Sequence, residues 1–157
     1  MSSSRAHSEE VEFSFGADPE GQVLFERFSG RLTPASLLEA FQSDELRSHY
    51  RPGIRIITDF TDAVLHIPYE EMRRFIHDMN DLLASGGGVH GRAAMVSETD
   101  VSFGNSRMYE ILTEEERSPD IGVFRDWNAA VAWLEVPDGA VDAARERAVT
   151  IKLSSAE

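Results

Sequence analysis

A short apolar run in the middle of the chain constrains the fold most. Residues 54–60 read Ile-Arg-Ile-Ile-Thr-Asp-Phe, and segments with helical periodicity stand on both sides of this run. Such a run is typical of a parallel strand whose faces are covered by helices. Ligands and partners of such sheets bind near the carboxyl ends of the strands. The sequence therefore predicts an α/β fold, with a functional edge in the loop from Asp59 to His66.

The same alternation of short apolar runs and helical segments continues along the chain and predicts one domain. We expect a mixed sheet of four or five strands with helices packed on it, beginning with an antiparallel hairpin over residues 11–28. Residues 1–10 are expected to be a flexible N-terminus, 11–136 the α/β domain and 137–157 a C-terminal extension. Parallel strands are predicted at about 54–60, 92–97 and 121–125, with 149–153 a candidate edge strand. Helices are predicted from Pro34 to about Tyr50, from Pro68 to Leu83, after Asp100, and from Asp126 to Leu134, with Thr33 and Asp126 as caps.

The composition excludes several classes of function. The chain has 157 residues, is 41% hydrophobic and carries a formal net charge of -13, with Lys152 its only lysine. A nucleic-acid-binding protein needs a clustered basic surface, so this class is not expected, and a partner attracted by charge should be basic. The absence of cysteine excludes disulfides, thiol catalysis and thiolate metal sites.

Two further patterns bear on location and metal binding. No stretch approaches the ~20 apolar residues that a membrane-spanning helix needs, and the first ten residues lack the apolar core of a secretory signal. These features predict a cytoplasmic protein without a membrane span. The histidines show neither His-x-His nor His-x-x-x-His spacing, so no metal site is expected.

Polar residues that follow the predicted strands are the candidate binding residues. Asp59, Thr61, Asp62 and His66 come at the end of the central strand, where acid–base groups are commonly placed. In the alternative interpretation, Asp59 caps backbone amides, Asp62 holds a turn and His66 is a surface or packing residue. A binding role for these four residues is the hypothesis to test.

A second group follows the next strand. Ser102, Asn105 and Arg107 are placed to line the same edge of the sheet as Asp59; the alternative is that they cap a helix. No recognisable nucleophile, base and orienting group occur together, so we do not expect an enzyme.

Two stretches carry a resemblance to a known family. Ile57-Thr58-Asp59-Phe60-Thr61 and the closing segment from Val123 to Leu134, read with the order of elements, resemble the STAS-like, SpoIIAA-like family of small α/β regulators. The resemblance covers roughly residues 11–136. It implies helices packed on a sheet, no cofactor, and binding by surface recognition.

The chain departs from that family at its phosphorylation site. In the regulators, a strand ending in Asp is followed by Asp-Ser-Ser-Gly, in which one serine is phosphorylated. Here Asp59 matches the strand end, but Ile67-Pro68-Tyr69-Glu70 stands where the second element is expected. The resemblance therefore implies a binding module without this phosphorylation switch.

Two functions remain open. The first is a regulatory module that recognises a protein partner through the loop Asp59 to His66. The second is a carrier of a small apolar ligand or lipid, because Met72, Phe75 and Met79 share one helix face with other apolar residues, although ordinary core packing explains the same spacing. We also expect a symmetric dimer, because the hairpin phenylalanines and the helix with Trp127 and Trp133 offer apolar surface.

Overall fold

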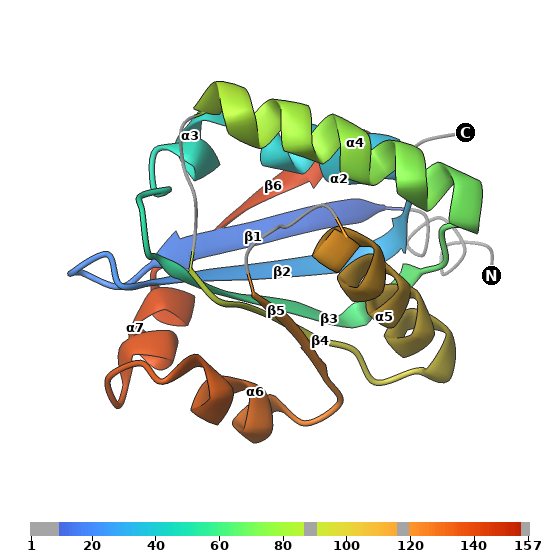
Figure 1. The fold of residues 1–157 in the computed structure, drawn as a ribbon. Coiled ribbons are helices and arrows are strands. Elements are labelled where there is room, and N and C mark those ends of the chain that lie inside the picture. The colour runs from blue at the N-terminus through green and yellow to red at the C-terminus, as the bar shows by residue number, and fades with distance from the viewer. Residues whose placement is uncertain (1–9, 87–90, 116–119, 155–157) are drawn as a thin grey trace, which may run out of the picture.

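Six strands form one mixed sheet in the part of the chain that the structure describes. The structure is a computed structural model and describes residues 10–86, 91–115 and 120–154. The strands lie in the order β5-β4-β3-β2-β1-β6 (Figure 1). They are β1 (Val11–Ala17), β2 (Val23–Leu32), β3 (Arg55–Leu65), β4 (Ala93–Val96), β5 (Ile121–Phe124) and β6 (Val149–Leu153). The predicted α/β class is confirmed, but the predicted strand number of four or five is too low.

The sixth strand comes from the predicted C-terminal extension. Residues 149–153 form β6, which pairs antiparallel with β1 at one edge of the sheet. Beyond β1, strand β2 is antiparallel to it, and β2, β3, β4 and β5 are mutually parallel. The hairpin strands β1 and β2 are therefore interior strands. Residues 1–9, which were predicted to be flexible, lie outside the described residues.

The order of the parallel strands decides which helices cover which face. From β2 to β5 each strand lies directly beside the one before it, and right-handed crossovers then place every connecting helix on the same face. Figure 1 shows these helices together on one side and the last two on the other. The first group is α2 (Pro34–Phe41), α3 (Asp44–Arg47), α4 (Tyr69–Gly86) and α5 (Asp100–Glu115); the second is α6 (Trp127–Leu134) and α7 (Ala140–Glu146).

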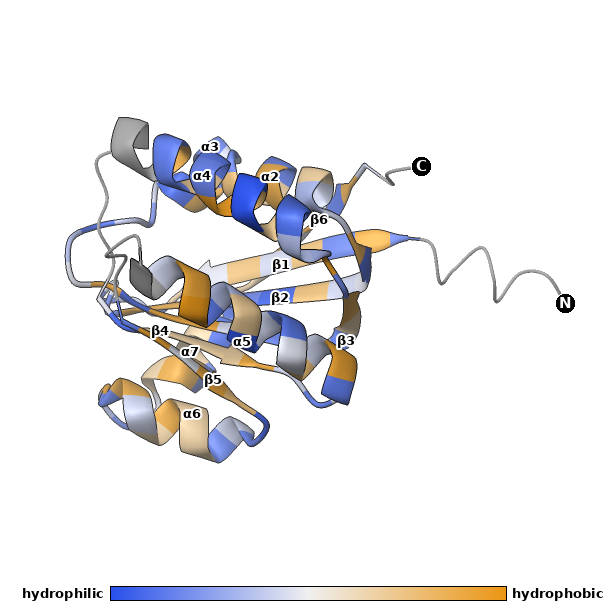
Figure 2. Ribbon diagram, turned by 45° about the vertical axis from the view of Figure 1, so that its right-hand side comes forward, coloured by the Kyte–Doolittle hydropathy of each residue, from blue (hydrophilic) through white to orange (hydrophobic). Residues whose placement is uncertain are grey.

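The two faces have separate hydrophobic cores. Below α2, α4 and α5 lie large side chains, with Phe13, Phe28 and Phe60 stacked across neighbouring strands. The other core, under α6 and α7, combines small residues such as Ala130 and Ala144 with a few larger ones such as Phe25 and Leu134. Figure 2 shows α4 hydrophilic on its outward side and hydrophobic toward the sheet. Its apolar residues at spacings of three and four explain this arrangement.

The helix predicted from Pro34 to Tyr50 is wrong in one respect, because it is interrupted. Thr33 caps α2 as expected, and its side chain accepts a hydrogen bond from the Ser36 amide. The helix ends at Phe41, and Ser43 then caps the short helix α3, since its Oγ accepts from the Leu46 amide at 3.3 Å. A serine that bonds nearby backbone amides favours a helix start over a helix interior.

The loop predicted from Asp59 to His66 is also wrong, because β3 continues to Leu65. Arg27 of β2 pairs with Asp59, and Ser29 pairs with Asp62, so β3 carries one extra residue between the two pairs. Such a bulge bends a strand without ending it. After the bulge, buried and exposed residues alternate again, which identifies a strand with one covered face.

The apolar surface that led us to expect a dimer is covered within the chain. Phe13, Phe15, Phe25 and Phe28 are all buried, because β6 and the helices enclose β1 and β2. The tryptophans are partly buried on different sides of α6, and the guanidinium of Arg145 lies 4.8 Å from the Trp127 ring. That of Arg92 lies 5.0 Å from the Trp133 ring. Self-association stays a prediction, for which light scattering across ionic strength is the measurement.

Candidate functional site

An apolar cavity of about 90 Å³ lies between the sheet and helices α2, α4 and α5. Apolar side chains dominate its lining, and among them are the flexible residues Met72, Met79 and Met95. Thioether side chains adapt to irregular spaces because they are unbranched and have three rotatable bonds. The cavity is therefore able to change shape around a guest molecule.

One carboxyl group faces this apolar space. Glu26 of β2 is only 2% exposed and lines the cavity. Its Oε1 accepts a hydrogen bond of 2.8 Å from the hydroxyl of Thr58. Among the described residues, its Oε2 is the one buried side-chain nitrogen or oxygen without a hydrogen-bond partner. A buried acceptor left unpaired costs about 1–3 kcal/mol, and more if it is charged.

Burial changes the ionisation of the groups around the cavity. Desolvation raises the pKa of Glu26 to about 7, although the hydrogen bond from Thr58 acts in the opposite direction. Burial of its hydroxyl end, together with the nearby Glu26, raises the pKa of Tyr109 to about 12. The same two causes raise the pKa of Tyr50. Glu26 is thus the group at the cavity that changes its charge near neutral pH.

The strand geometry explains why this carboxyl points inward. Leu24, Glu26 and Phe28 are alternate residues of β2, so all three side chains lie on the face that α2 and α4 cover. Thr58 is the direct neighbour of Glu26 on β3 in the strand register. Residues opposite each other on adjacent strands are close enough for side-chain hydrogen bonds.

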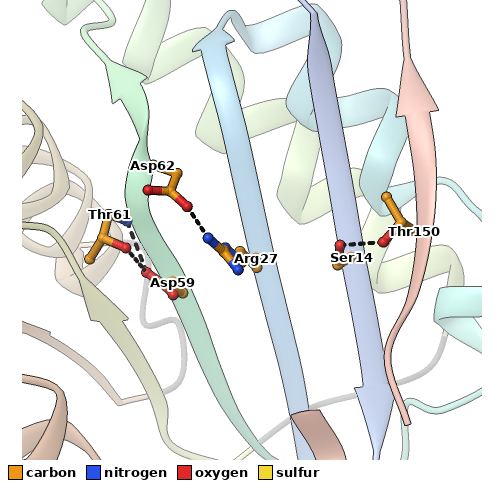
Figure 3. A network of polar contacts seen from close by, with 6 residues as sticks. All are labelled: Ser14, Arg27, Asp59, Thr61, Asp62 and Thr150. Atoms are coloured by element: carbon orange, nitrogen blue, oxygen red, sulfur yellow. Dashed lines mark hydrogen bonds and ion pairs between the residues drawn. The ribbon is translucent and has the colours of Figure 1, made fainter. Parts of the chain in front are cut away.

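The predicted residues Asp59, Thr61 and Asp62 lie outside this cavity. Asp59 Oδ1 accepts hydrogen bonds from the amide and the hydroxyl of Thr61, at 2.9 and 2.7 Å (Figure 3). These bonds hold the bulge of β3. Asp62 is exposed and forms an ion pair with Arg27 on the neighbouring strand. The structure thus brings the three residues together on β3, not in a loop.

The predicted residues of α5 connect it to the end of β3. Ser102 Oγ accepts from the Leu65 amide at 3.0 Å. The Asn105 side chain bonds both backbone groups of Ile67: its Oδ1 accepts at 3.0 Å and its Nδ2 donates at 2.9 Å. Both side chains are buried, and their polar atoms are used in holding this connection.

The remaining two predicted residues are exposed. Arg107 forms an ion pair of 2.6 Å with Glu110 on the surface of α5. His66 lies just after β3 and is exposed. A role in binding for any of the seven predicted residues stays a prediction.

The sequence analysis missed Glu26, Thr58, Tyr50 and Tyr109. The sequence contained a signal for Glu26. It alternates with Leu24 and Phe28 along a predicted strand, so the three side chains share one face of the sheet. The tyrosines gave no comparable signal. Tyr50 follows α3 and Tyr109 lies within α5, and only the packing of these segments brings them to the same cavity.

The described residues also bear on metal binding and membrane insertion. No three His, Asp or Glu side chains there are grouped as ligands for a metal ion. None of the helices there has both the length and the apolar character needed to cross a membrane.

Comparisons with known proteins concern the fold. No protein-family model and no curated protein matches the chain. One similar solved structure is a crystal structure from Shewanella loihica PV-4, described as an uncharacterized protein from the DUF3478 family with a SpoIIAA-like fold. The two chains are 18% identical, with a TM-score of 0.46, and the match covers 78% of this chain and 93% of that chain.

Proposed function

We propose that this protein is a non-enzymatic module that binds a small, mainly apolar molecule in the cavity beneath α4. The observation that carries the proposal is the combination of apolar lining, adaptable methionines and one unpaired buried oxygen at Glu26. Ligand pockets are commonly apolar spaces with a few polar groups that fix orientation. If position 26 served only to pack the core, a leucine or methionine there would make the fold more stable than a glutamate does.

The volume sets the size of the ligand. Apolar cavities of ~150 Å³ admit benzene, and the space here is about 90 Å³ before any side chain moves. Rotation of Met72, Met79 and Met95 would supply the difference for a single ring or a short branched chain. A long acyl chain does not fit this space.

The ionisable groups argue against catalysis in the cavity. General acid–base chemistry commonly pairs a carboxyl with a second acid, base or nucleophile. Among the described lining residues, the other ionisable groups are Tyr50 and Tyr109, whose raised pKa values keep them protonated at neutral pH. Glu26 therefore acts in recognition in this proposal.

Methionine-methyl NMR tests the proposal directly. Toluene and phenol are titrated into protein labelled at the methionine methyl groups. We expect the signals of Met72, Met79 and Met95 to shift, while that of Met108 changes little, because it packs on the same core without lining the cavity. We expect a dissociation constant on the order of 1 mM, equivalent to about 4 kcal/mol. Absence of saturable shifts with both ligands would contradict the proposal.

A matched pair of variants locates the binding. Ala93 lines the cavity, so Ala93→Val fills part of the space and should weaken binding of both ligands. Thr150→Val introduces the same residue on the exposed edge strand β6 and should leave binding unchanged. Equal binding by both variants would place the ligand elsewhere.

A protein partner is a second candidate function, favoured by the exposed part of the opposite sheet face. There Ser14, Arg27, Asp62, Val64 and Thr150 form what we term the open sheet patch, four members of which are seen side by side in Figure 3. All except the half-buried Ser14 are exposed, and Val64 is 44% exposed. In this proposal the partner contacts β3 through Asp62.

Pull-down experiments test this second candidate. Asp62→Ala should lose a partner that wild-type protein retains. Asp142→Ala is the control, because it removes another exposed carboxylate that pairs with an arginine, Arg145 on α7. Asp59→Ala and Thr61→Ala are less informative, since they remove the bonds that hold the bulge. A partner kept by Asp62→Ala would remove the patch from consideration.

A further inference from the structure

The unpaired oxygen of Glu26 specifies the chemistry of the ligand. Its partner oxygen is engaged by Thr58, whereas Oε2 is buried beside apolar atoms and has no donor. An apolar molecule entering the cavity would remove any remaining contact of this oxygen with water. The free-energy cost of leaving the oxygen without a hydrogen bond would then increase. A molecule that brings a donor would offset that cost.

We propose that the cavity selects a small apolar molecule carrying one hydroxyl group, which donates a hydrogen bond to Oε2 of Glu26. This inference rests on the proposed function of the cavity and adds the polar group of the ligand. A small phenol or a short branched alcohol has the required chemistry.

Other polar groups fit this site less well. A carboxylate would meet the Glu26 carboxyl in a protein with a formal net charge of -13. An ammonium brings three donors, whereas the polar side chains lining the described cavity are Glu26, Thr58, Tyr50 and Tyr109. Among the described residues one buried side-chain oxygen lacks a donor, and the full charge of an ammonium would also have to leave water for a mainly apolar space. A single hydroxyl matches the single free oxygen.

The ionisation of Glu26 agrees with this choice. Because burial raises its pKa to about 7, the group is largely anionic above neutral pH and is then a strong acceptor. The nearby charge of Glu26 contributes to the raised pKa values of Tyr50 and Tyr109. Arg47, on the same side of the sheet, opposes the rise in the pKa of Tyr50. The ligand hydroxyl adds the donor that this oxygen lacks.

The test compares phenol with toluene, which have similar size and differ in the donor. Their dissociation constants are measured for wild type and for Glu26→Leu at about pH 8, above the pKa of Glu26. Comparing the ratio of the two constants between wild type and Glu26→Leu cancels the ligands' different affinities for water, because the free ligands are the same in both measurements. We expect the preference for phenol to fall on the order of tenfold in Glu26→Leu, which corresponds to one hydrogen bond to a charged group. Glu71→Leu is the control: it makes the same exchange at an exposed site on α4, outside the cavity lining, and should retain the preference.

A measurement on wild-type protein makes the test independent of whether the variants fold. The carbon-13 signal of the Glu26 carboxyl should shift on saturation with phenol and should shift much less with toluene. If neither ligand binds, the proposed function fails. If both bind with a ratio that Glu26→Leu leaves unchanged, and the carboxyl signal responds equally to both, the cavity binds ligands but this inference is wrong.

Discussion

Alternate residues of β2 enter two layers that are packed differently. Leu24, Glu26 and Phe28 face α2 and α4, whereas Val23 and Phe25 face α6 and α7. On the second face the backbones approach closely: a methyl group added to Gly16 would lie 2.6 Å from the carbonyl oxygen of Ala144. On the first face, phenylalanines and methionines hold the helices off the sheet and leave a cavity.

This difference follows from side-chain size. The distance between packed elements depends on the residues at the contact, and alanine and glycine allow α7 to lie directly on the strands. The larger side chains under α2, α4 and α5 leave the cavity of about 90 Å³ between them. One sheet therefore supports a close-packed layer and a layer with room for a ligand.

The largest expected effect is loss of the aromatic stack that builds the cavity layer. Phe28 is fully buried, and its ring lies 4.5 Å from that of Phe13 and 5.5 Å from that of Phe60. We expect Phe28→Ala to lower the free energy of unfolding by about 4 kcal/mol, measured by urea denaturation. Phe124→Ala, on the edge strand β5 and only half-buried, is the control and should cost less. A loss of stability that is smaller for Phe28→Ala than for Phe124→Ala would mean that the layer with the cavity contributes little to stability.

The second-largest expected effect is a pH dependence of the free energy of unfolding that arises from Glu26 in the layer with the cavity. The pKa of Glu26 rises from 4.5 to about 7 on folding, so the folded state binds more protons between these values. Stability should therefore fall as pH rises through this window, by about 3 kcal/mol for this group.

Glu26→Gln removes that dependence. The variant should be more stable than wild type above pH 7, and the advantage should disappear toward pH 4.5. Thermal unfolding between pH 4.5 and 8 measures this difference. Glu71→Gln, at an exposed site on α4, should keep the wild-type pH profile. Parallel profiles for wild type and Glu26→Gln would show that the carboxyl is not desolvated.

Two neighbouring alanines compare the layers directly. Ala93 lines the cavity, and Ala94, the next residue of β4, is fully buried in the core under α6 and α7. We expect Ala94→Val to destabilise the protein by about 1–3 kcal/mol through overpacking, and Ala93→Val to change stability by less than about 0.5 kcal/mol. Urea denaturation of both variants is the measurement. Equal costs would mean that the space beside Ala93 is too small to accept two methyl groups.

Local periodicity predicted most of the elements, because the repeat of apolar residues differs between strands and helices. The runs at 54–60, 92–97 and 121–125 each contain or overlap a parallel strand, and the edge strand at 149–153 is confirmed. Thr33 and Asp126 were expected to cap helices, and both do. These features depend on residues close together in the chain.

Features that depend on distant residues were not predicted. The bulge at Asp59 exists because β2 and β3 pair with unequal numbers of residues, which neither strand shows alone. The helix face of Met72, Phe75 and Met79 was considered as a ligand wall, but the size of the cavity depends on how far α4 and α5 stand from the sheet. Glu26 was the one part of the site with a local signal, since a carboxyl between Leu24 and Phe28 on one strand face must be buried if that face is covered.

The smallest effect is expected on the open sheet patch, where solvent replaces a covering helix. The side chains of Arg27 and Asp62 are 47% and 51% exposed, so water and salt screen their ion pair. We expect a double-mutant cycle of Arg27→Ala and Asp62→Ala to give a coupling energy below about 1 kcal/mol, decreasing as salt is added. Urea denaturation at low and high ionic strength provides the four stabilities. The buried pair of Glu26 and Thr58 lies on the opposite face of the same two strands and should in contrast respond little to salt. A strong, salt-independent coupling at the surface pair would show that this part of the sheet is shielded from solvent, and it would remove the contrast between the two faces on which the comparison depends.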